Sequence, residues 1–101
     1  MTTRERLPNR RHSASLNLEL HGLQYTVTFS RFADDRIAEV FLQNHKPGSQ
    51  SNSNARDAAV AASLALQFGC PLDVLRRALL RVPSTPLGAA LDLLAERERG
   101  P

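Results

Sequence analysis

The chain has 101 residues, of which 42% are hydrophobic and 23% are charged. This length and composition predict one small soluble domain with a modest core, which association with another protein would help to stabilise. No apolar stretch is long enough to span a bilayer, and no apolar signal region follows the N-terminus. We therefore expect a cytoplasmic protein. Its single cysteine, Cys70, allows neither an intrachain disulfide nor a cysteine-based metal site.

The net charge of +3 is concentrated in the first twelve residues, where four arginines face one glutamate. The rest of the chain is balanced, because it holds nine of the 13 basic and nine of the 10 acidic residues. A balanced body offers no electrostatic footprint for nucleic acid, although the arm could contact phosphates or an acidic partner through charge alone. We expect residues 1–12 to form a disordered basic arm and do not expect nucleic acid as a partner.

Alternating apolar and polar residues predict strands in the first half of the chain. Leucines alternate with polar residues from Leu16 to Leu20, and the alternation resumes from Leu23 to Phe29. His21-Gly22 between them is a two-residue turn in which glycine accepts a positive φ. Residues 37–42 are β-branched and aromatic enough for a third strand. A three-stranded antiparallel meander follows.

Helical signals fill the second half. Residues 43–53 lack periodicity and predict a mobile loop, after which Asn54 can cap a helix over 55–68. That helix is apolar at almost every position, and its polar exceptions Arg56, Ser63 and Gln67 fall near one line, so we expect burial over most of its circumference. Gly69-Cys70-Pro71 predicts a tight corner to a second helix. A third helix is expected from residue 85 to about 94, followed by a disordered tail over 97–101.

The predicted fold class is α+β, with the three-stranded antiparallel β-meander packed against two to three helices. Four segments carry a resemblance in the same order as a known family: E-V-F-L at 39–42, K-P-G-S at 46–49, S-L-A-L-Q-F-G-C-P-L-D at 63–73 and P-L-G-A-A-L-D-L-L at 86–94. The chain resembles the TSCPD domain, as in cobalamin-dependent (class II) ribonucleotide reductases and small stand-alone TSCPD-like proteins of bacteria and phages. We expect this domain to occupy residues 13–96.

The resemblance implies a link to nucleotide metabolism but no catalysis. The reductase's radical-forming cysteines, its redox cysteine pair and its C-terminal cysteine motif have no counterparts in this chain, and the cysteine of the eponymous motif is missing. We expect no enzyme, cofactor or metal site, because the remaining titratable groups form no nucleophile-base, acid-base or metal-binding set. These groups are His12, His21, His45, Cys70, Asp34, Asp35 and Glu39.

One segment has the chemistry of an anion site. A lysine, a glycine, a hydroxyl, an amide and an arginine precede or enter the predicted helix, whose free N–H groups could hold a phosphate. The alternative is a plain solvated connection, since polar loops before helices are common and no phosphate-loop pattern is present. The candidate ligand residues are Lys46, Gly48, Ser49, Asn54 and Arg56.

The sequence thus leaves three functions open. The first is a non-catalytic ribonucleotide-reductase-related module that associates with itself, as a homodimer, or docks on a reductase or another nucleotide-metabolism enzyme through its apolar helix and sheet edge. The second is an oligomeric binder of a phosphorylated, nucleotide-type small molecule through the Lys46 loop and the helix N-terminus. The third is a nucleic-acid accessory protein that uses the arginine arm. We favour the first.

Overall fold

The computed structural model describes residues 3–9, 12–46 and 48–99. The elements follow in the order β1 (Ser13–Leu20), β2 (Leu23–Arg31), β3 (Ile37–Asn44), α1 (Gln50–Gln67), α2 (Leu72–Ala78) and α3 (Pro86–Arg99). The strands form one antiparallel sheet in the order β1-β2-β3. The predicted α+β meander with three helices is confirmed.

The β1-β2 hairpin turns at the predicted dipeptide. His21 and Gly22 have φ angles of 51° and 81°, and Leu20 pairs with Leu23 directly before and after them. Two consecutive positive φ angles match the right-handed twist of the flanking strands, which is why such turns favour glycine. This local geometry sets the register of the whole hairpin.

The sheet has one apolar and one polar face. Tyr25, Val27 and Phe29 of β2 are buried, and the residues between them are partly exposed on the other side, as the alternation predicts. The polar face is rich in hydroxyl groups, and Ser15 Oγ lies 3.0 Å from Thr28 Oγ1 across the β1-β2 pair. The helices must therefore cover only the apolar face.

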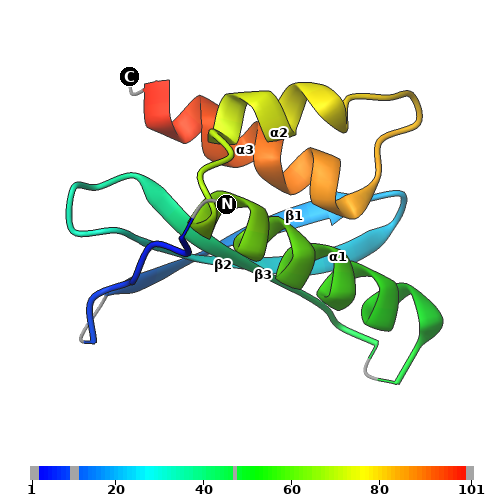
Figure 1. Ribbon diagram of the computed structural model, residues 1–101. Coiled ribbons are helices and arrows are strands. Elements are labelled where there is room, and N and C mark those ends of the chain that lie inside the picture. Colours follow the sequence, from blue (N-terminus) through cyan, green and yellow to red (C-terminus); the bar gives the residue numbers. More distant parts are fainter. Residues whose placement is uncertain (1–2, 10–11, 47, 100–101) are drawn as a thin grey trace.

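Helices α1 and α3 provide that cover (Figure 1). Helix α1 packs against β3, while α3 contributes Leu91 and Leu94, both fully buried, to the same core as Val27 and Val40. Helix α2 packs on α3, where Asp73 pairs with both Arg76 and Arg77 and Arg76 also reaches Asp92. The core thus lies between the sheet on one side and helices α1 and α3 on the other.

The segment between β3 and α1 is shorter than the sequence predicted. Strand β3 continues to Asn44 and α1 begins at Gln50, so the predicted loop over 43–53 and the predicted cap at Asn54 were wrong. Ser49 caps the helix, since its side chain accepts a hydrogen bond from the Asn52 N–H at 3.2 Å. Serine and asparagine rank equally as caps, so propensity alone could not choose between Ser49 and Asn54.

Helix α3 extends beyond the predicted end of order and runs through 97–99, while residues 100–101 lie outside the described part. Its last turn is held to the sheet. Arg31 forms an ion pair with Glu98 at 2.6 Å, and the Arg97 guanidinium lies 5.9 Å from the centre of the Phe29 ring. These long-range contacts give the charged end of the helix partners that sequence periodicity does not show.

Candidate functional site

Helix α1 lies along the outer edge of β3 and bonds to its backbone through polar side chains. Ser63 Oγ accepts from the Val40 N–H at 2.8 Å and donates to the Val40 carbonyl at 2.9 Å. Gln67 Nε2 donates to the Ala38 carbonyl, and Asn52 Oδ1 accepts from the Asn44 N–H. The helix therefore replaces part of the strand that would otherwise pair with this edge.

This arrangement reverses the expected orientation of α1. The sequence predicted a helix buried on most of its circumference, with its polar residues on the exposed line. Instead Ser63 and Gln67 are buried, together with the small residues that let the helix approach β3. An edge strand has unpaired N–H and C=O groups, so the face that covers it needs hydrogen-bonding side chains rather than purely apolar ones.

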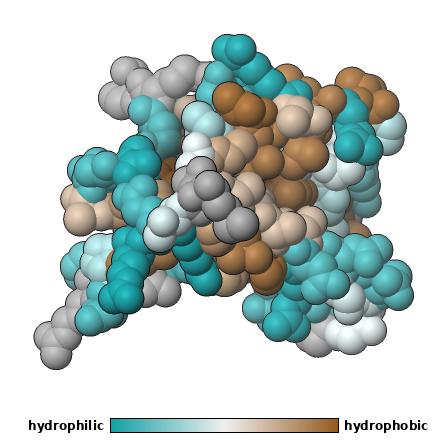
Figure 2. All heavy atoms as spheres, viewed as in Figure 1, coloured by the Kyte–Doolittle hydropathy of each residue, from teal (hydrophilic) through white to brown (hydrophobic). Residues whose placement is uncertain are grey.

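The outward face of α1 consequently carries large apolar residues. Val60, Leu64 and Phe68, which we call the α1 stripe, are 50%, 40% and 44% exposed and follow one another at four-residue intervals. Residues at this spacing share one side of a helix. Figure 2 shows hydrophobic residues gathered over α2 and part of α1, with hydrophilic residues over the N-terminal end of α1.

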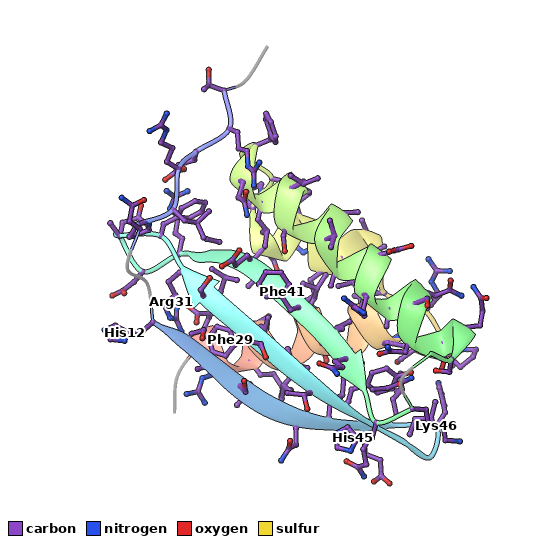
Figure 3. The ribbon with its side chains drawn as sticks, turned by 90° about the horizontal axis from the view of Figure 1, so that it is seen from below. His12, Phe29, Arg31, Phe41, His45 and Lys46 are labelled. Carbon is purple, nitrogen blue, oxygen red and sulfur yellow. The ribbon has the colours of Figure 1, made fainter. Side chains whose placement is uncertain are left out.

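Phe41 extends this surface onto β3. Its side chain is 46% exposed on the polar face of the sheet, beside α1, and it borders the same shallow hollow as Val60. Figure 3 shows Phe41 on β3 next to the helix. The sequence contained the four-residue spacing of the stripe, but an all-apolar helix gave no signal of which side faces outward.

The structure separates the five predicted phosphate ligands. Lys46, Gly48 and Ser49 lie in the short connection before α1, where Gly48 has a φ of 80° and Ser49 Oγ donates to the Lys46 carbonyl at 2.7 Å. The Ser49 hydroxyl also accepts a hydrogen bond from the Asn52 N–H. One of the backbone N–H groups at the start of the helix that could hold a phosphate therefore already has a partner within the chain. Phosphate binding at this connection stays a prediction.

The other two predicted ligands lie within α1 rather than before it, and they border different hollows. Asn54 accepts a hydrogen bond from Gln50 Nε2 at 3.0 Å and lines a hollow beside the β1-β2 hairpin. Arg56 lines the hollow that Phe41 and Val60 border. Because the helix starts five residues earlier than predicted, neither side chain belongs to its first turn.

The histidines and the cysteine are spread over the fold. His12 is exposed, His21 Nε2 lies 2.9 Å from the Ser84 carbonyl and His45 Nε2 lies 3.5 Å from Thr26 Oγ1. His12 and His45 lie at opposite ends of the sheet, the latter beside Lys46 (Figure 3). Cys70 is partly buried in the corner between α1 and α2. Among the described residues no three His, Cys, Asp or Glu side chains group as metal ligands would.

The carboxylates have separate structural contacts. Arg36 bonds to Asp34 at 2.7 Å, and its hydrogen bonds hold the pKa of that carboxyl below its usual value. The Glu98 carboxylate raises the pKa of Arg31 through their hydrogen bond. Glu39 is buried on the polar face and accepts a hydrogen bond from Ser30 Oγ at 2.5 Å.

No helix in the described ranges is both long and apolar enough to cross a membrane.

Sequence comparison finds relatives named vitamin B12-dependent ribonucleotide reductase. The protein of Agrobacterium fabrum is 37% identical over 70 residues, which make up 69% of this chain and 6% of that protein. The protein of Bradyrhizobium diazoefficiens is 34% identical over 73 residues, or 72% of this chain and 6% of that protein. For Rhodopirellula baltica the identity is 29% over 85 residues, or 84% of this chain and 8% of that protein.

The chain thus spans only a small fraction of the length of these relatives. No protein-family model matches it. No solved structure matches it significantly. The sequence matches nevertheless cover most of this chain, and they agree with the resemblance carried by its four motifs. The chain therefore contains a TSCPD-like domain related to a segment of vitamin B12-dependent ribonucleotide reductases, a family of nucleotide metabolism.

Proposed function

We propose that this domain is a non-catalytic module related to ribonucleotide reductase, that it acts by protein–protein association, and that its partner is a second copy of the chain. The observation that carries the proposal is the α1 stripe. Its three large apolar side chains are each 40% to 50% exposed: Val60 and Leu64 lie in line on the outward face of the longest helix, and Phe68 follows them as its C-cap. Contiguous apolar surface on a soluble domain is a mark of an association site.

The orientation of α1 strengthens this argument. Rotation of the helix could bury the stripe, but the edge of β3 holds Ser63 and Gln67 inward by hydrogen bonds to Val40 and Ala38. The stripe therefore remains exposed in the folded monomer. Phe41, on the neighbouring strand, widens the apolar surface beyond one helix face.

The spacing of the stripe suits a second copy. A two-fold axis near Leu64 would set two α1 helices antiparallel, with Val60 of one copy opposite Phe68 of the other. Such an interface is self-complementary, as two-fold dimers require. Ala61 beside the stripe is exposed and small, so it leaves room for close approach. A domain of 101 residues also has little core of its own, and a dimer interface supplements it.

The non-catalytic part of the proposal rests on composition. Ribonucleotide reduction in the family that the chain resembles depends on several cysteines, and this chain has one, Cys70. The relatives' activity belongs to proteins of which the matched segment is 6% to 8%. Association, in contrast, needs only the surface that the fold presents.

Leu64→Lys tests the proposal, with Leu80→Lys as the matched control. Leu64 is 40% exposed in the centre of the stripe, and Leu80 is 57% exposed after α2, outside it. Near the two-fold axis, Leu64→Lys brings two like charges together in an apolar contact. We therefore expect the dissociation constant of the dimer to rise at least 100-fold, which corresponds to a loss of about 3 kcal/mol of association free energy. Sedimentation velocity over a concentration series measures this, and the control should match the wild type.

Two results would contradict self-association through the stripe. One is a wild-type protein that stays monomeric across the micromolar range. The other is a dimer that dissociates equally in both variants or in neither. A third result would refute the second copy as the partner. If the protein is a monomer that binds a purified reductase chain, and only Leu64→Lys loses that binding, the α1 stripe is a docking site for a nucleotide-metabolism enzyme.

A further inference from the structure

A hollow of about 480 Å³ opens between the β1-β2 hairpin, the first half of α1 and the segment from α2 to α3. This volume lies within the range of small-molecule sites. Four leucines from three parts of the chain form its apolar wall, and none of its described lining residues is Asp, Glu, Lys or Arg. These leucines are Leu20, Leu23, Leu79 and Leu87.

Tyr25 gives this hollow a polar group that has no partner among the described residues. Its side chain is only 3% exposed and lines the hollow, yet its hydroxyl forms no hydrogen bond with any described residue. Every fully buried side-chain nitrogen and oxygen in the described part of the chain has a partner. The Tyr25 hydroxyl must therefore be reached by solvent, and the hollow is the opening that its side chain borders. A buried tyrosine hydroxyl normally has a hydrogen-bond partner.

Two further polar groups lie on the α1 side of the same hollow. Asn54 Oδ1 is occupied by Gln50 Nε2, whereas the two N–H donors of the Asn54 amide bond to no described residue. The Ser51 hydroxyl receives a hydrogen bond from Asn44 Nδ2 at 2.9 Å and keeps a lone pair. The hollow thus combines hydrogen-bonding groups on β2 and α1 with apolar side chains from the hairpin and from the α2-α3 segment.

We infer that this hollow binds the uncharged heteroaromatic ring of a nucleoside-type molecule, with the ring edge against Tyr25 and Asn54. The described lining holds no Asp, Glu, Lys or Arg, and the imidazole of His21 in that lining already has the Ser84 carbonyl 2.9 Å from its Nε2. The hollow therefore selects an uncharged group, since burying a charge without a partner is costly. The leucine wall favours a flat carbon-rich body, and the polar side requires donors and acceptors along one edge. A nucleobase combines these properties. This site is separate from the α1 stripe, so the inference does not depend on self-association.

Titration of the full chain with adenosine, guanosine, cytidine and uridine, one at a time, tests the inference. We expect one of them to give saturable ¹H–¹⁵N shifts that cluster at the residues lining the hollow, and calorimetry gives the dissociation constant. Tyr25→Phe keeps the ring and removes only the hydroxyl, so binding should weaken about three- to tenfold, the range for one hydrogen bond.

A second pair of variants separates filling of the hollow from the general effect of a larger side chain on a helix. Ala58 lines the hollow and is partly buried, whereas Ala78 at the end of α2 is exposed, lies outside the α1 stripe and lines none of the hollows described for this fold. Ala58→Leu should abolish nucleoside binding and Ala78→Leu should leave the dissociation constant unchanged. Unchanged circular dichroism and melting in both variants would show that the fold is intact.

Titration with the monophosphate of the nucleoside that binds shows whether the hollow accepts only free nucleosides or also nucleotides. Binding of both, with equal sensitivity to Tyr25→Phe and Ala58→Leu, supports the inference with the phosphate outside the hollow. The inference is overturned if none of the four nucleosides produces saturable shifts. It is also overturned if only the monophosphate binds and neither variant alters its affinity, or if Ala58→Leu changes the sedimentation of the protein while nucleosides have no effect.

Discussion

Buried polar side chains decide how this small fold closes its sheet. Ser63 is 6% exposed and both donates to and accepts from the backbone of Val40, so one hydroxyl satisfies two groups of the edge strand. Gln67 satisfies the carbonyl of Ala38, and Asn52 satisfies the N–H of Asn44, on the same edge of β3. Each bond is worth little by itself, but a buried backbone group left without a partner is costly.

Replacing Ser63 with alanine should therefore destabilise the protein more than loss of a surface hydroxyl does. Ser63→Ala leaves the Val40 N–H and carbonyl without their partner, and we expect a loss of about 1 to 3 kcal/mol in the free energy of unfolding. Ser53→Ala on the exposed side of the same helix is the control and should change it by less than about 0.5 kcal/mol. Urea denaturation measures both. Equal effects would show that the contact to β3 contributes nothing.

At the scale of elements, the N-terminal arm is more than a charged extension. Within residues 3–9, Arg4 Nε donates to Gln67 Oε1 at 2.6 Å and the Glu5 N–H donates to the Gln67 carbonyl at 2.7 Å. Glu5 also pairs with Arg36 at 2.7 Å. These contacts attach the arm to the C-terminal end of α1 and to the β2-β3 turn. The prediction of a disordered arm over 1–12 rests on the absence of apolar periodicity, which cannot reveal polar contacts of this kind, and residues 1–2 and 10–11 of that range lie outside the described residues.

A point substitution tests whether the arm stabilises α1. Arg4→Ala removes the partner of the Gln67 side-chain oxygen, and we expect a loss of about 1 kcal/mol in the free energy of unfolding. Arg6→Ala is the matched control, because Arg6 makes no ion pair or hydrogen bond within the described part of the chain. Thermal unfolding at low and high salt measures the difference. If both variants melt as the wild type does, the arm does not contribute to stability.

For the molecule as a whole, the core depends on α3, although this helix comes last in the chain. Leu91 and Leu94 are fully buried and join the strand residues in one cluster, and α3 also supports α2. A domain of 101 residues has little surplus stability, so we expect the contact of α3 with the sheet to be needed for folding.

Leu91→Ala should consequently be among the most damaging single substitutions. Loss of a fully buried leucine side chain costs about 2 to 5 kcal/mol, a large part of the stability expected of such a domain. Leu80→Ala removes the same atoms from a side chain that is 57% exposed and should cost less than about 1 kcal/mol. Chemical denaturation compares them. A small effect of Leu91→Ala would mean that α3 docks loosely on the sheet.

The sequence by itself determined the features that short-range chemistry controls. Alternation gave the strands, and the positive φ at Gly22 and Gly69 explains the hairpin turn and the helix corner at the predicted positions. The sequence also carried the TSCPD resemblance, which its relatives support. Each of these depends on residues that are neighbours in the chain or share one motif.

Only the tertiary structure decided which side of α1 faces the sheet and which polar residues border a hollow. Ser63 and Gln67 lie inward because they meet the edge of β3, a strand more than twenty residues away, and the α1 stripe faces outward as a result. Asn54 joins Tyr25 at the leucine-lined hollow for a similar reason, since the hairpin and the α2-α3 segment close around α1. Helical periodicity shows which residues share a face, but the hydrogen-bonding needs of the packed neighbour determine which face is buried.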